Sequence, residues 1–308
     1  MGEAIRSWAN TCACLLAAIL LAVSAGTSRA QGQPQPDHPA VTVRGQVYTP
    51  RSILARNMGT EEDQTTPFTP HKIIGNVYYV GTRTLSSFLV TTPQGHILID
   101  STYERNVPGI QKSVEQLGFK FLDIKILLGN HAHADHQEGD ALVKQLTGAQ
   151  VMAMAEDVPA LQAIKPGGKE HPIDRILHDG NEVTLGGTTL VAHLTPGHTR
   201  GCTTWTMKAL EGRRSYNVMF GCSLRPPGVV TPAIAAEFNR SFTLVRAFPC
   251  DVQLGDHGAQ YNMQQRFARV RTGGRNPFIE PASCTLEADL EEAMFHAILA
   301  EQQKTERP

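Results

Sequence analysis

The sequence predicts an α/β protein built from two packed β-sheets whose outer faces are covered by helices. Two observations predict this fold class. Short apolar and β-branched runs, typical of strands, occur in both halves of the chain. Segments with a helical spacing of apolar residues accompany the strands in each half. Two sheets that face each other, with helices outside, bury the apolar faces of both halves.

The composition is that of an ordinary soluble globular protein. The chain has 308 residues, of which 41% are hydrophobic and 19% are charged. Its 28 Lys and Arg residues nearly balance its 29 Asp and Glu residues, so the formal net charge is −1. This balance gives no reason to expect nucleic acid or an anionic membrane as a partner. The length permits two domains but is equally usual for a single α/β domain.

Residues 1–30 have the composition of a secretory signal peptide. Arg6 gives a weakly basic start, and the apolar run 12–23 is too short to cross a bilayer comfortably. Ser28 and Ala30 supply the small residues of a signal-peptidase site. We therefore expect cleavage after Ala30, a periplasmic or secreted protein, and no membrane contact after cleavage. The alternative is an uncleaved anchor, since the apolar segment carries no charge.

The remaining chain divides into a polar arm and one domain. Residues 31–67 are polar and proline-rich, which is typical of a linker or a loosely packed N-terminal arm. Strand and helix periodicity begins after Pro70, so we place the α/β domain at residues 68–308.

Strand and helix patterns alternate through the first half of the domain. Residues 74–80 and 87–90 resemble a pair of strands, and the apolar strand 96–99 ends at Asp100. The next helical pattern is stopped by Gly118. The spacing of apolar residues predicts helices over 107–117, 140–146 and 158–164, and buried strands over 124–128 and 150–154.

The second half opens with two predicted hairpins. Gly186-Gly187 separates the strands 182–185 and 188–194, and such a dipeptide is a two-residue hairpin signal. Glu211-Gly212 separates a second pair of strands in the same way. The remaining predicted elements are the strands of that second pair over 203–210 and 216–220, a helix over 232–246, a strand over 251–254 and a helix over 286–303.

The segment with most chemical information is His131-Ala132-His133-Ala134-Asp135-His136. The chain has only 12 histidines in 308 residues, so three of them beside an aspartate in six positions are improbable by chance. The segment follows an apolar strand and precedes a helix, where functional side chains are commonly presented. Imidazole and carboxylate groups suit zinc, and three protein ligands with an open position are typical of a catalytic zinc site.

Two further histidines follow predicted strands in similar settings. His198 lies in a Pro-Gly-His-Thr turn after the strand 188–194, and His257 follows the strand 251–254. Each alone could be an ordinary loop histidine. Together with the cluster they give six ligands, enough for two three-ligand sites and therefore for two zinc ions per chain.

This pattern of His-x-His-x-Asp-His, Pro-Gly-His-Thr and a late histidine resembles the metallo-β-lactamase superfamily over roughly residues 68–284. The resemblance implies an α/β (α+β) fold, a four-layer αββα sandwich with metals at the edge between its sheets. By position, Asp100 matches a buried aspartate that orients the ligand loop. The implied zinc ligands are His131, His133 and His198 in the first site, and Asp135, His136 and His257 in the second.

The position of Ser223 decides the branch of the superfamily. Many relatives have a bridging Asp there, and the first two lactamase subclasses have a Cys. Ser223 instead resembles the third subclass of class B β-lactamases, with Cys222 as the alternative if the alignment shifts by one residue. The resemblance implies that Ser223 donates a hydrogen bond to the substrate carboxylate. Arg225 could bind the same carboxylate, or it could be an ordinary exposed arginine.

Four cysteines remain after the signal peptide takes away Cys12 and Cys14. An even number in an oxidising compartment suggests disulfides, and spacing alone leaves all three pairings open. The resemblance implies the pair Cys250–Cys284, which leaves Cys202 and Cys222 for a second bridge.

The resemblance implies a zinc-dependent hydrolase that opens the β-lactam ring with a metal-bound hydroxide and confers β-lactam antibiotic resistance. Asp135 would be the catalytic residue, because it holds the nucleophile in line. We expect a monomer that acts on small-molecule β-lactams. The alternative enzyme is another superfamily hydrolase, a lactonase or a glyoxalase II-like thioesterase. The alternative from another class is a periplasmic zinc-binding protein without turnover.

Overall fold

The computed structural model describes residues 39–226 and 228–305. The predicted signal peptide and its cleavage point at Ala30 lie outside these residues. Within the described part of the chain, every helix is too short or too polar to span a bilayer.

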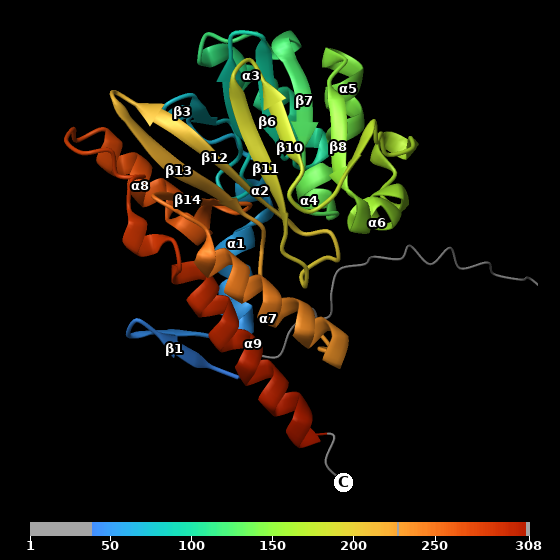
Figure 1. The fold of residues 1–308 in the computed structure, drawn as a ribbon, viewed down its shortest axis with the longest axis vertical. Helices are drawn as coiled ribbons and strands as arrows, with labels where there is room; N and C mark the ends of the chain where they lie inside the picture. The colour runs from blue at the N-terminus through green and yellow to red at the C-terminus, as the bar shows by residue number, and fades with distance from the viewer. Residues whose placement is uncertain (1–38, 227, 306–308) are drawn as a thin grey trace, which may run out of the picture. The chain divides into compact units, whose positions relative to one another are not determined.

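The first sheet has seven strands and occupies the first half of the chain (Figure 1). The strands from β3 to β6 are antiparallel neighbours, and those from β6 to β9 are parallel. In order they are β3 (His71–Ile74), β4 (Val77–Tyr79), β5 (Phe88–Thr92), β6 (Gly95–Ile99), β7 (Ile124–Leu128), β8 (Gln150–Met154) and β9 (Arg175–Leu177).

The second sheet has five strands in sequence order. Its neighbours are antiparallel except for the parallel pair of the last two strands. Both predicted hairpins are confirmed, and Gly186 and Gly187 take positive φ angles in the first turn. The strands are β10 (Glu182–Leu185), β11 (Thr188–Leu194), β12 (Thr203–Glu211), β13 (Arg214–Gly221) and β14 (Val252–Gly255).

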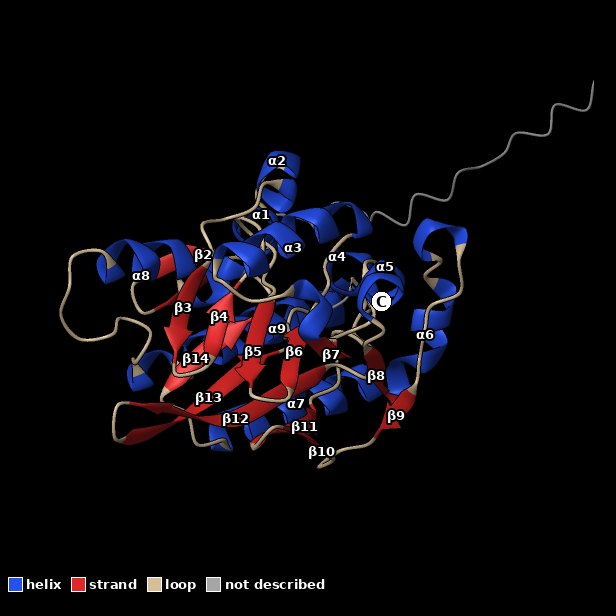
Figure 2. Cartoon of the chain, turned by 90° about the horizontal axis from the view of Figure 1, so that it is seen from above, coloured by secondary structure: helices blue, strands red, loops and turns tan. Residues whose placement is uncertain are grey.

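The two sheets pack face to face, with helices on both outer faces (Figure 2). Alternation along single strands produces these layers, because successive side chains point to opposite faces of a sheet. In β6, Ile97 belongs to the core between the sheets, whereas Leu98 belongs to the outer core under α3 (Val107–Gln116) and α5 (Asp140–Thr147).

The second sheet follows the same rule. Phe220 of β13 joins the core between the sheets, whereas its neighbour Met219 packs under α7 (Pro232–Ala247) and α9 (Leu286–Thr305). Burying a side chain as large as Phe220 stabilises the fold by about 2 kcal/mol. The predicted αββα sandwich is confirmed.

The expectation of a loosely packed arm over residues 31–67 is wrong for its second part. Residues 41–65 form β1 (Val41–Val43), β2 (Gln46–Tyr48), α1 (Pro50–Met58) and α2 (Glu61–Thr65). Ile53 of α1 is fully buried in a small core with Leu290 and Met294 of α9. The polar composition of the segment hid this packing, because the buried face of α1 consists of Pro50, Ile53 and Asn57, which do not form an apolar period.

Several boundaries also differ from prediction. Residues 74–80 are a hairpin and not one strand, because Gly75 at φ 52° starts a turn between β3 and β4. Three elements are not predicted from the sequence: α4 (Ala134–Gln137), α8 (Met263–Val270) and the edge strand β9. The helix predicted over 158–164 is α6 (Val158–Ala163). Short 3₁₀ turns lie at Glu104–Asn106, Phe121–Asp123, Ala155–Asp157, Pro166–Gly168, Gly258–Tyr261 and Pro281–Ser283.

The candidate functional residues follow the ends of strands in both sheets. Asp100 comes directly after β6, and the segment 131–136 comes shortly after β7. His198 follows β11, Ser223 follows β13 and His257 follows β14. Since β6 and β7 are parallel neighbours, as are β13 and β14, the loops after each pair leave their sheet at the same edge. The fold thereby brings distant segments into one site.

Candidate metal centre

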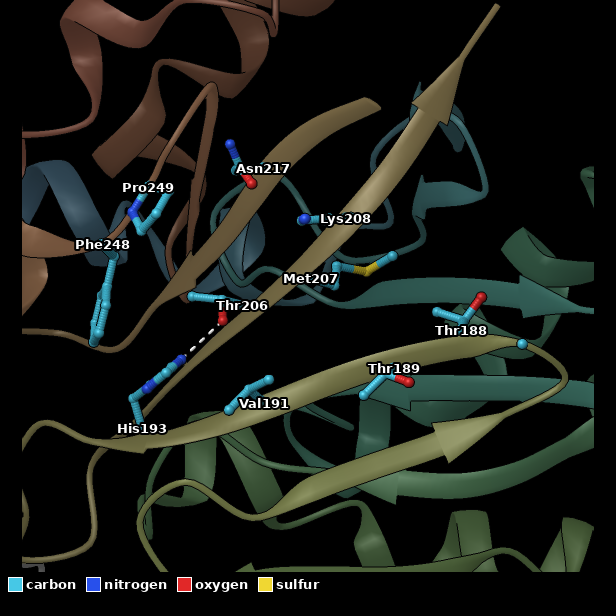
Figure 3. A pocket seen from close by; sticks show the side chains of 11 residues that line it. Thr188, Thr189, Val191, His193, Thr206, Met207, Lys208, Asn217, Phe248 and Pro249 are labelled. Atoms are coloured by element: carbon cyan, nitrogen blue, oxygen red, sulfur yellow. Dashed lines mark hydrogen bonds between the residues drawn. The ribbon is translucent and has the colours of Figure 1, made fainter. Parts of the chain in front are cut away.

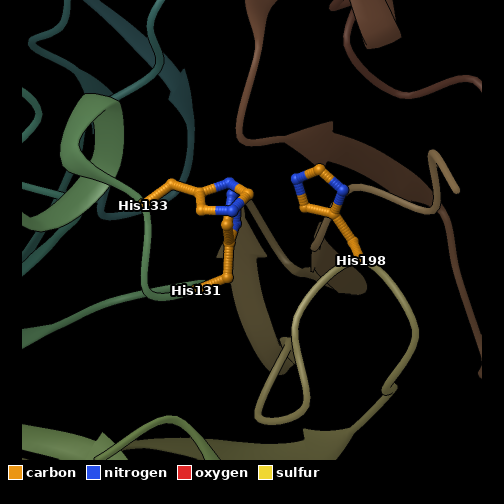
Figure 4. Close-up of side chains that lie close together, drawn as sticks. All are labelled: His131, His133 and His198. Atoms are coloured by element: carbon orange, nitrogen blue, oxygen red, sulfur yellow. The ribbon is translucent and has the colours of Figure 1, made fainter. Parts of the chain in front are cut away.

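Three imidazoles from two loops form the first site, which is His131, His133 and His198 (Figure 4). Their candidate ligand atoms all lie within 4.8 Å of one another. The ring centroids of His198 are 4.7 Å from His131 and 4.8 Å from His133, with the planes nearly perpendicular. Rings that converge in this way without stacking leave room for one ion between their nitrogen atoms.

The second site joins Asp135 and His136, at the start of α4, to His257 from the other sheet. Asp135 Oδ2 lies 3.3 Å from His136 Nε2 and 3.8 Å from His257 Nε2. The rings of His131 and His136 are 4.2 Å apart, so the two sites are adjacent. The structure therefore brings all six predicted ligands together as two groups of three.

The outward ring nitrogens of these histidines are held by oxygen atoms. His198 Nδ1 lies 2.9 Å from the Arg225 carbonyl oxygen, and His136 Nδ1 lies 3.3 Å from Asp100 Oδ2. Because carbonyl and carboxylate oxygens only accept, Nδ1–H donates in both cases, which leaves Nε2 as the nitrogen available to a metal. This is the arrangement that orients histidine ligands in metal sites.

The buried nitrogen atoms test whether a metal fits. Nε2 of His131 and Nε2 of His136 have no hydrogen-bond partner among the described residues, and both side chains are buried. An unpaired buried polar atom is costly, and native proteins rarely keep one without a reason. A metal ion at each group would satisfy these atoms, so the residues fit the ligand set that the sequence predicts.

The electrostatics of the first site also suit a metal. Burial lowers the pKa of His131 to about 3, and burial likewise lowers the pKa of His133 and His198. Burial lowers the pKa of His257 to about 4. These four imidazoles are therefore neutral at physiological pH, which is the form that coordinates metals.

His136 is the exception among the histidines. Burial opposes its charge, but the adjacent carboxylates of Asp135 and Asp100 outweigh burial and hold its pKa well above the usual value. Burial likewise disfavours the charged form of Asp135, yet the neighbouring His136 holds its pKa well below the usual value. Asp135 is thus ionised, and a metal would take the place of the proton on His136.

Asp100 lies where the sequence predicts it, behind the ligand loop. It is fully buried at φ 61°, and its Oδ1 accepts a 2.7 Å hydrogen bond from the Asn130 backbone N–H. Its other oxygen accepts from His136. Burial raises the pKa of Asp100 to about 6. A single carboxylate therefore connects the start of the ligand loop to a ligand of the second site.

The two predicted substrate contacts differ in their surroundings. Ser223 is only 4% exposed, and its hydroxyl donates to Asp256 Oδ1 at 2.9 Å while accepting from Gln260 at 3.1 Å. Its role as a substrate contact stays a prediction, and these hydrogen bonds favour a supporting role. Arg225 is partly exposed, and its charge contributes to the lowered pKa of His133 and His198. Its backbone carbonyl oxygen lies 2.9 Å from His198 Nδ1, which places the residue beside the first site.

Both predicted disulfides are present, Cys202–Cys222 and Cys250–Cys284. Cys222 Sγ lies 3.5 Å from His131 Nδ1, on the side of the ring away from Nε2. The alternative in which Cys222 is a metal ligand is wrong, because its sulfur is already bonded to Cys202.

Two buried carboxylates at the site, Asp256 and Asp157, are not predicted from the sequence. Asp256 Oδ2 lies 3.3 Å from His131 Nδ1 and accepts a 2.7 Å hydrogen bond from the Ser223 backbone. Asp157 accepts hydrogen bonds from both loops of the first site. The available signal was weak: Asp256 directly precedes a ligand, as Asp135 does, but Asp157 lies far from every ligand in sequence.

A cavity of about 480 Å³ lies on the second sheet, away from these residues (Figure 3). It is lined by β11, β12 and β13 side chains, with Phe248 and Pro249 closing one side. His193 contributes its ring there, with Nε2 2.8 Å from Thr206 Oγ1. None of the six predicted ligands lines this cavity, so it is separate from the metal centre.

Comparisons of the sequence and of the structure with known proteins both point to the metallo-β-lactamase superfamily. The sequence profile of the metallo-β-lactamase superfamily matches residues 80–209. The structure is similar to the FEZ-1 metallo-β-lactamase from Legionella gormanii, with 40% identity and a TM-score of 0.73 over 78% of this chain and 98% of that one. It is also similar to BJP-1, a subclass B3 metallo-β-lactamase of Bradyrhizobium japonicum, with 36% identity and a TM-score of 0.73 over 80% and 99% of the two chains.

A more distant match is the human mitochondrial persulfide dioxygenase ETHE1, which is 27% identical over 111 residues. That match spans 36% of this chain and 38% of the human protein, so it supports relationship at the level of the superfamily only. A Cronobacter sakazakii metallo-β-lactamase with 33% identity is described by its HARLDQ motif. Residues 131–136 of this chain read HAHADH and contain three histidines, whereas the HARLDQ motif contains one.

The αββα sandwich and the two adjacent His/Asp groups together indicate a metal-dependent hydrolase. The chain belongs to the metallo-β-lactamase superfamily, and the solved structures that it resembles at 31–40% identity are subclass B3 metallo-β-lactamases.

Proposed function

We propose that this protein is a zinc-dependent β-lactamase that hydrolyses the cyclic amide bond of β-lactam antibiotics. The observation that carries the proposal is the pair of adjacent three-ligand groups, His131, His133 and His198 beside Asp135, His136 and His257. Similarity to subclass B3 enzymes over nearly their whole length supports the choice of substrate. Resistance to β-lactams in the producing cell would follow from this activity.

Two zinc ions per chain fit the donor set, because the first site offers three neutral imidazoles and the second offers two imidazoles and a carboxylate. Bound zinc would lower the pKa of water toward 7 and polarise the β-lactam carbonyl. The protein fixes the ligand geometry through the oxygen atoms on the Nδ1 side of the rings.

Asp135 is the proposed catalytic residue. Its carboxylate lies between His136 and His257 and stays ionised, so it can hold a water molecule by accepting its hydrogen bond. An ionised carboxylate so placed also accepts a proton during attack on the carbonyl carbon. Asp100 supports this function indirectly by orienting His136.

Arg225 is the proposed contact for the substrate carboxylate. Its backbone oxygen holds His198, so its side chain starts at the edge of the first site. A guanidinium presents parallel N–H donors that match a carboxylate. Ser223 remains a candidate for the same carboxylate, although its hydroxyl is engaged by Asp256 and Gln260.

The proposed setting is outside the cytoplasm, as a monomer. The two disulfides are compatible with an exported protein, because such bonds persist in oxidising compartments. The signal peptide at residues 1–30 is the expected means of export.

The test is a hydrolysis assay across a penicillin, a carbapenem, a lactone and a thioester, on metal-free protein before and after zinc is restored. We expect zinc-dependent loss of the β-lactam absorbance and little turnover of the other compounds. The double variant His133→Ala/His198→Ala should be inactive with zinc. Preferred turnover of the lactone or thioester would replace the β-lactamase proposal with the alternative hydrolase. Nitrocefin turnover retained by the double variant would overturn the assignment of the site.

A further inference from the structure

Asp157 lies at the start of α6 but does not use its side chain there. It is the residue directly before the helix, a position where aspartate commonly caps the free backbone N–H groups. Here the carboxylate makes no such capping bond. The side chain is only 2% exposed, so its charge is compensated by other groups.

Those groups belong to the two loops that carry the first site. Asp157 Oδ2 accepts hydrogen bonds from the Ala132 backbone N–H at 2.9 Å and from Thr199 Oγ1 at 2.8 Å. Asp157 Oδ1 accepts from the Gly201 backbone N–H at 2.7 Å. Ala132 is the residue between His131 and His133, and Thr199 directly follows His198.

The backbone at Gly201 is adapted to this contact. A Cβ atom at this position would lie 2.5 Å from the Asp157 backbone nitrogen and 2.6 Å from the Asp157 Cβ. Real side chains do not approach so closely, so any larger residue would push the loop of His198 away from Asp157. Glycine at this position is therefore required by the close approach.

We propose that Asp157 is a positioning residue that fixes the distance between the two ligand loops of the first metal site. One carboxylate holds the segment between His131 and His133 against the segment that follows His198. The zinc affinity of the first site depends on this contact, whereas Asp157 accepts no hydrogen bond from Asp135, His136 or His257. The inference rests on the metal site of the proposed function and not on its substrate.

An amide cannot replace this carboxylate. The three groups facing Asp157 are two backbone N–H donors and one hydroxyl, and both carboxylate oxygens face a backbone N–H. In the variant Asp157→Asn, the NH₂ group must therefore face Ala132 N–H or Gly201 N–H in either orientation. The substitution keeps the volume of the side chain and removes one loop contact.

The experiment measures zinc affinity by competition with a chelator, one site at a time, in the full chain. The His257→Ala background isolates the first site, and the His198→Ala background isolates the second. We expect Asp157→Asn to weaken the first site by about 10- to 100-fold and the second by less than about twofold. Thr199→Val, which removes one donor, should weaken the first site by about three- to tenfold, and Thr199→Ser should restore it.

Asp251→Asn is the matched control, because Asp251 also accepts two hydrogen bonds, from Asn217, away from the metal ligands. Both hydrogen bonds go to Oδ2, which the amide oxygen of asparagine can replace, so the variant should keep the melting temperature and both zinc affinities of the unaltered protein. Asp157→Asn with unchanged first-site affinity would overturn the proposal, as would equal weakening of both sites. If Asp157→Asn does not fold, the same criteria apply to the Thr199 variants. Failure of the unaltered first site to bind zinc would overturn the proposed function as well.

Discussion

At the residue scale, three histidines of the metal centre, His131, His136 and His198, have an oxygen atom on the Nδ1 side of the ring. His198 uses a backbone carbonyl and His136 uses Asp100. Burial keeps the pKa of His131 at about 3, so its ring stays neutral over the whole physiological range. The orientations of these three rings are thus set before any metal binds, which reduces the reorganisation that binding requires.

Arg225 gives the prediction that belongs to a single side chain. Arg225→Ala should raise KM for β-lactams that carry a carboxylate by about tenfold, because one charge-assisted contact is lost. The backbone oxygen that holds His198 is unaffected, so kcat should change by less than about threefold. Steady-state kinetics would check both constants.

The matched control is Arg200→Ala, an exposed arginine in the loop of His198. Its KM should equal that of the unaltered protein. If Arg225→Ala lowers kcat and leaves KM unchanged, Arg225 supports the metal centre and does not bind the substrate carboxylate.

At the element scale, much of the fold could be predicted from apolar spacing. The helix over 107–116 and the strand over 124–128 have clean patterns, and Gly186-Gly187 marks its hairpin. The turn at Gly75 was missed because the apolar run continues across it. The packing of α1 was also missed, since Ile53 is its one contribution to the apolar core with α9 and the other buried residues are Pro50 and Asn57.

The site could be predicted to the same extent and for a similar reason. Ligands in a short motif, such as His131 and His133, are visible because their spacing is local. Asp157 and Asp256 act through contacts between loops that are distant in sequence, and no local sequence pattern predicts such contacts. The burial of Ser223 was likewise invisible, because it depends on Gln260 from another segment.

The two disulfides give a prediction at this scale. Removing either, as Cys202→Ser/Cys222→Ser or Cys250→Ser/Cys284→Ser, should cost about 3 to 4 kcal/mol of stability because similar lengths of chain are released. Only the first pair should also lower the zinc affinity of the first site, since Cys222 lies 3.5 Å from His131 Nδ1. Urea unfolding and chelator competition would measure the two effects. Equal zinc affinities in the two double variants would contradict this account.

Helix α9 carries a buried carboxyl group, Glu291, whose titration lowers the free energy of unfolding at neutral pH. Burial, together with the adjacent Glu287, raises the pKa of Glu291 to about 8. The folded state therefore keeps the proton up to about pH 8, whereas the unfolded chain releases it near the model-peptide value of about 4.3. The stability from this group is complete at low pH and declines as the pH rises through that window.

Glu291→Gln should consequently be more stable than the unaltered protein at pH 8, by a margin that shrinks toward pH 5. Melting temperatures of the metal-free proteins across this range would measure the margin. Glu301→Gln, an exposed position on the same helix, should show no such trend. A constant difference between Glu291→Gln and the unaltered protein at all pH values would show that the carboxyl group does not titrate as described.

At the scale of the whole molecule, the sandwich explains how six ligands from both halves of the chain meet. The first sheet presents residues 131–136 after β7, and the second presents His198 and His257 after β11 and β14. Metal bound between the two halves should link them, so zinc at 100 times its dissociation constant should stabilise the folded protein by about 2.7 kcal/mol for each occupied site.

The central claim is that these ligands make two sites of three, and zinc stoichiometry tests it most directly. Metal analysis after equilibrium dialysis should give two zinc ions per chain for the unaltered protein. It should give one for the His133→Ala/His198→Ala variant and one for His257→Ala, because each change removes a different site. A single zinc ion in the unaltered protein, or two in His257→Ala, would contradict the account.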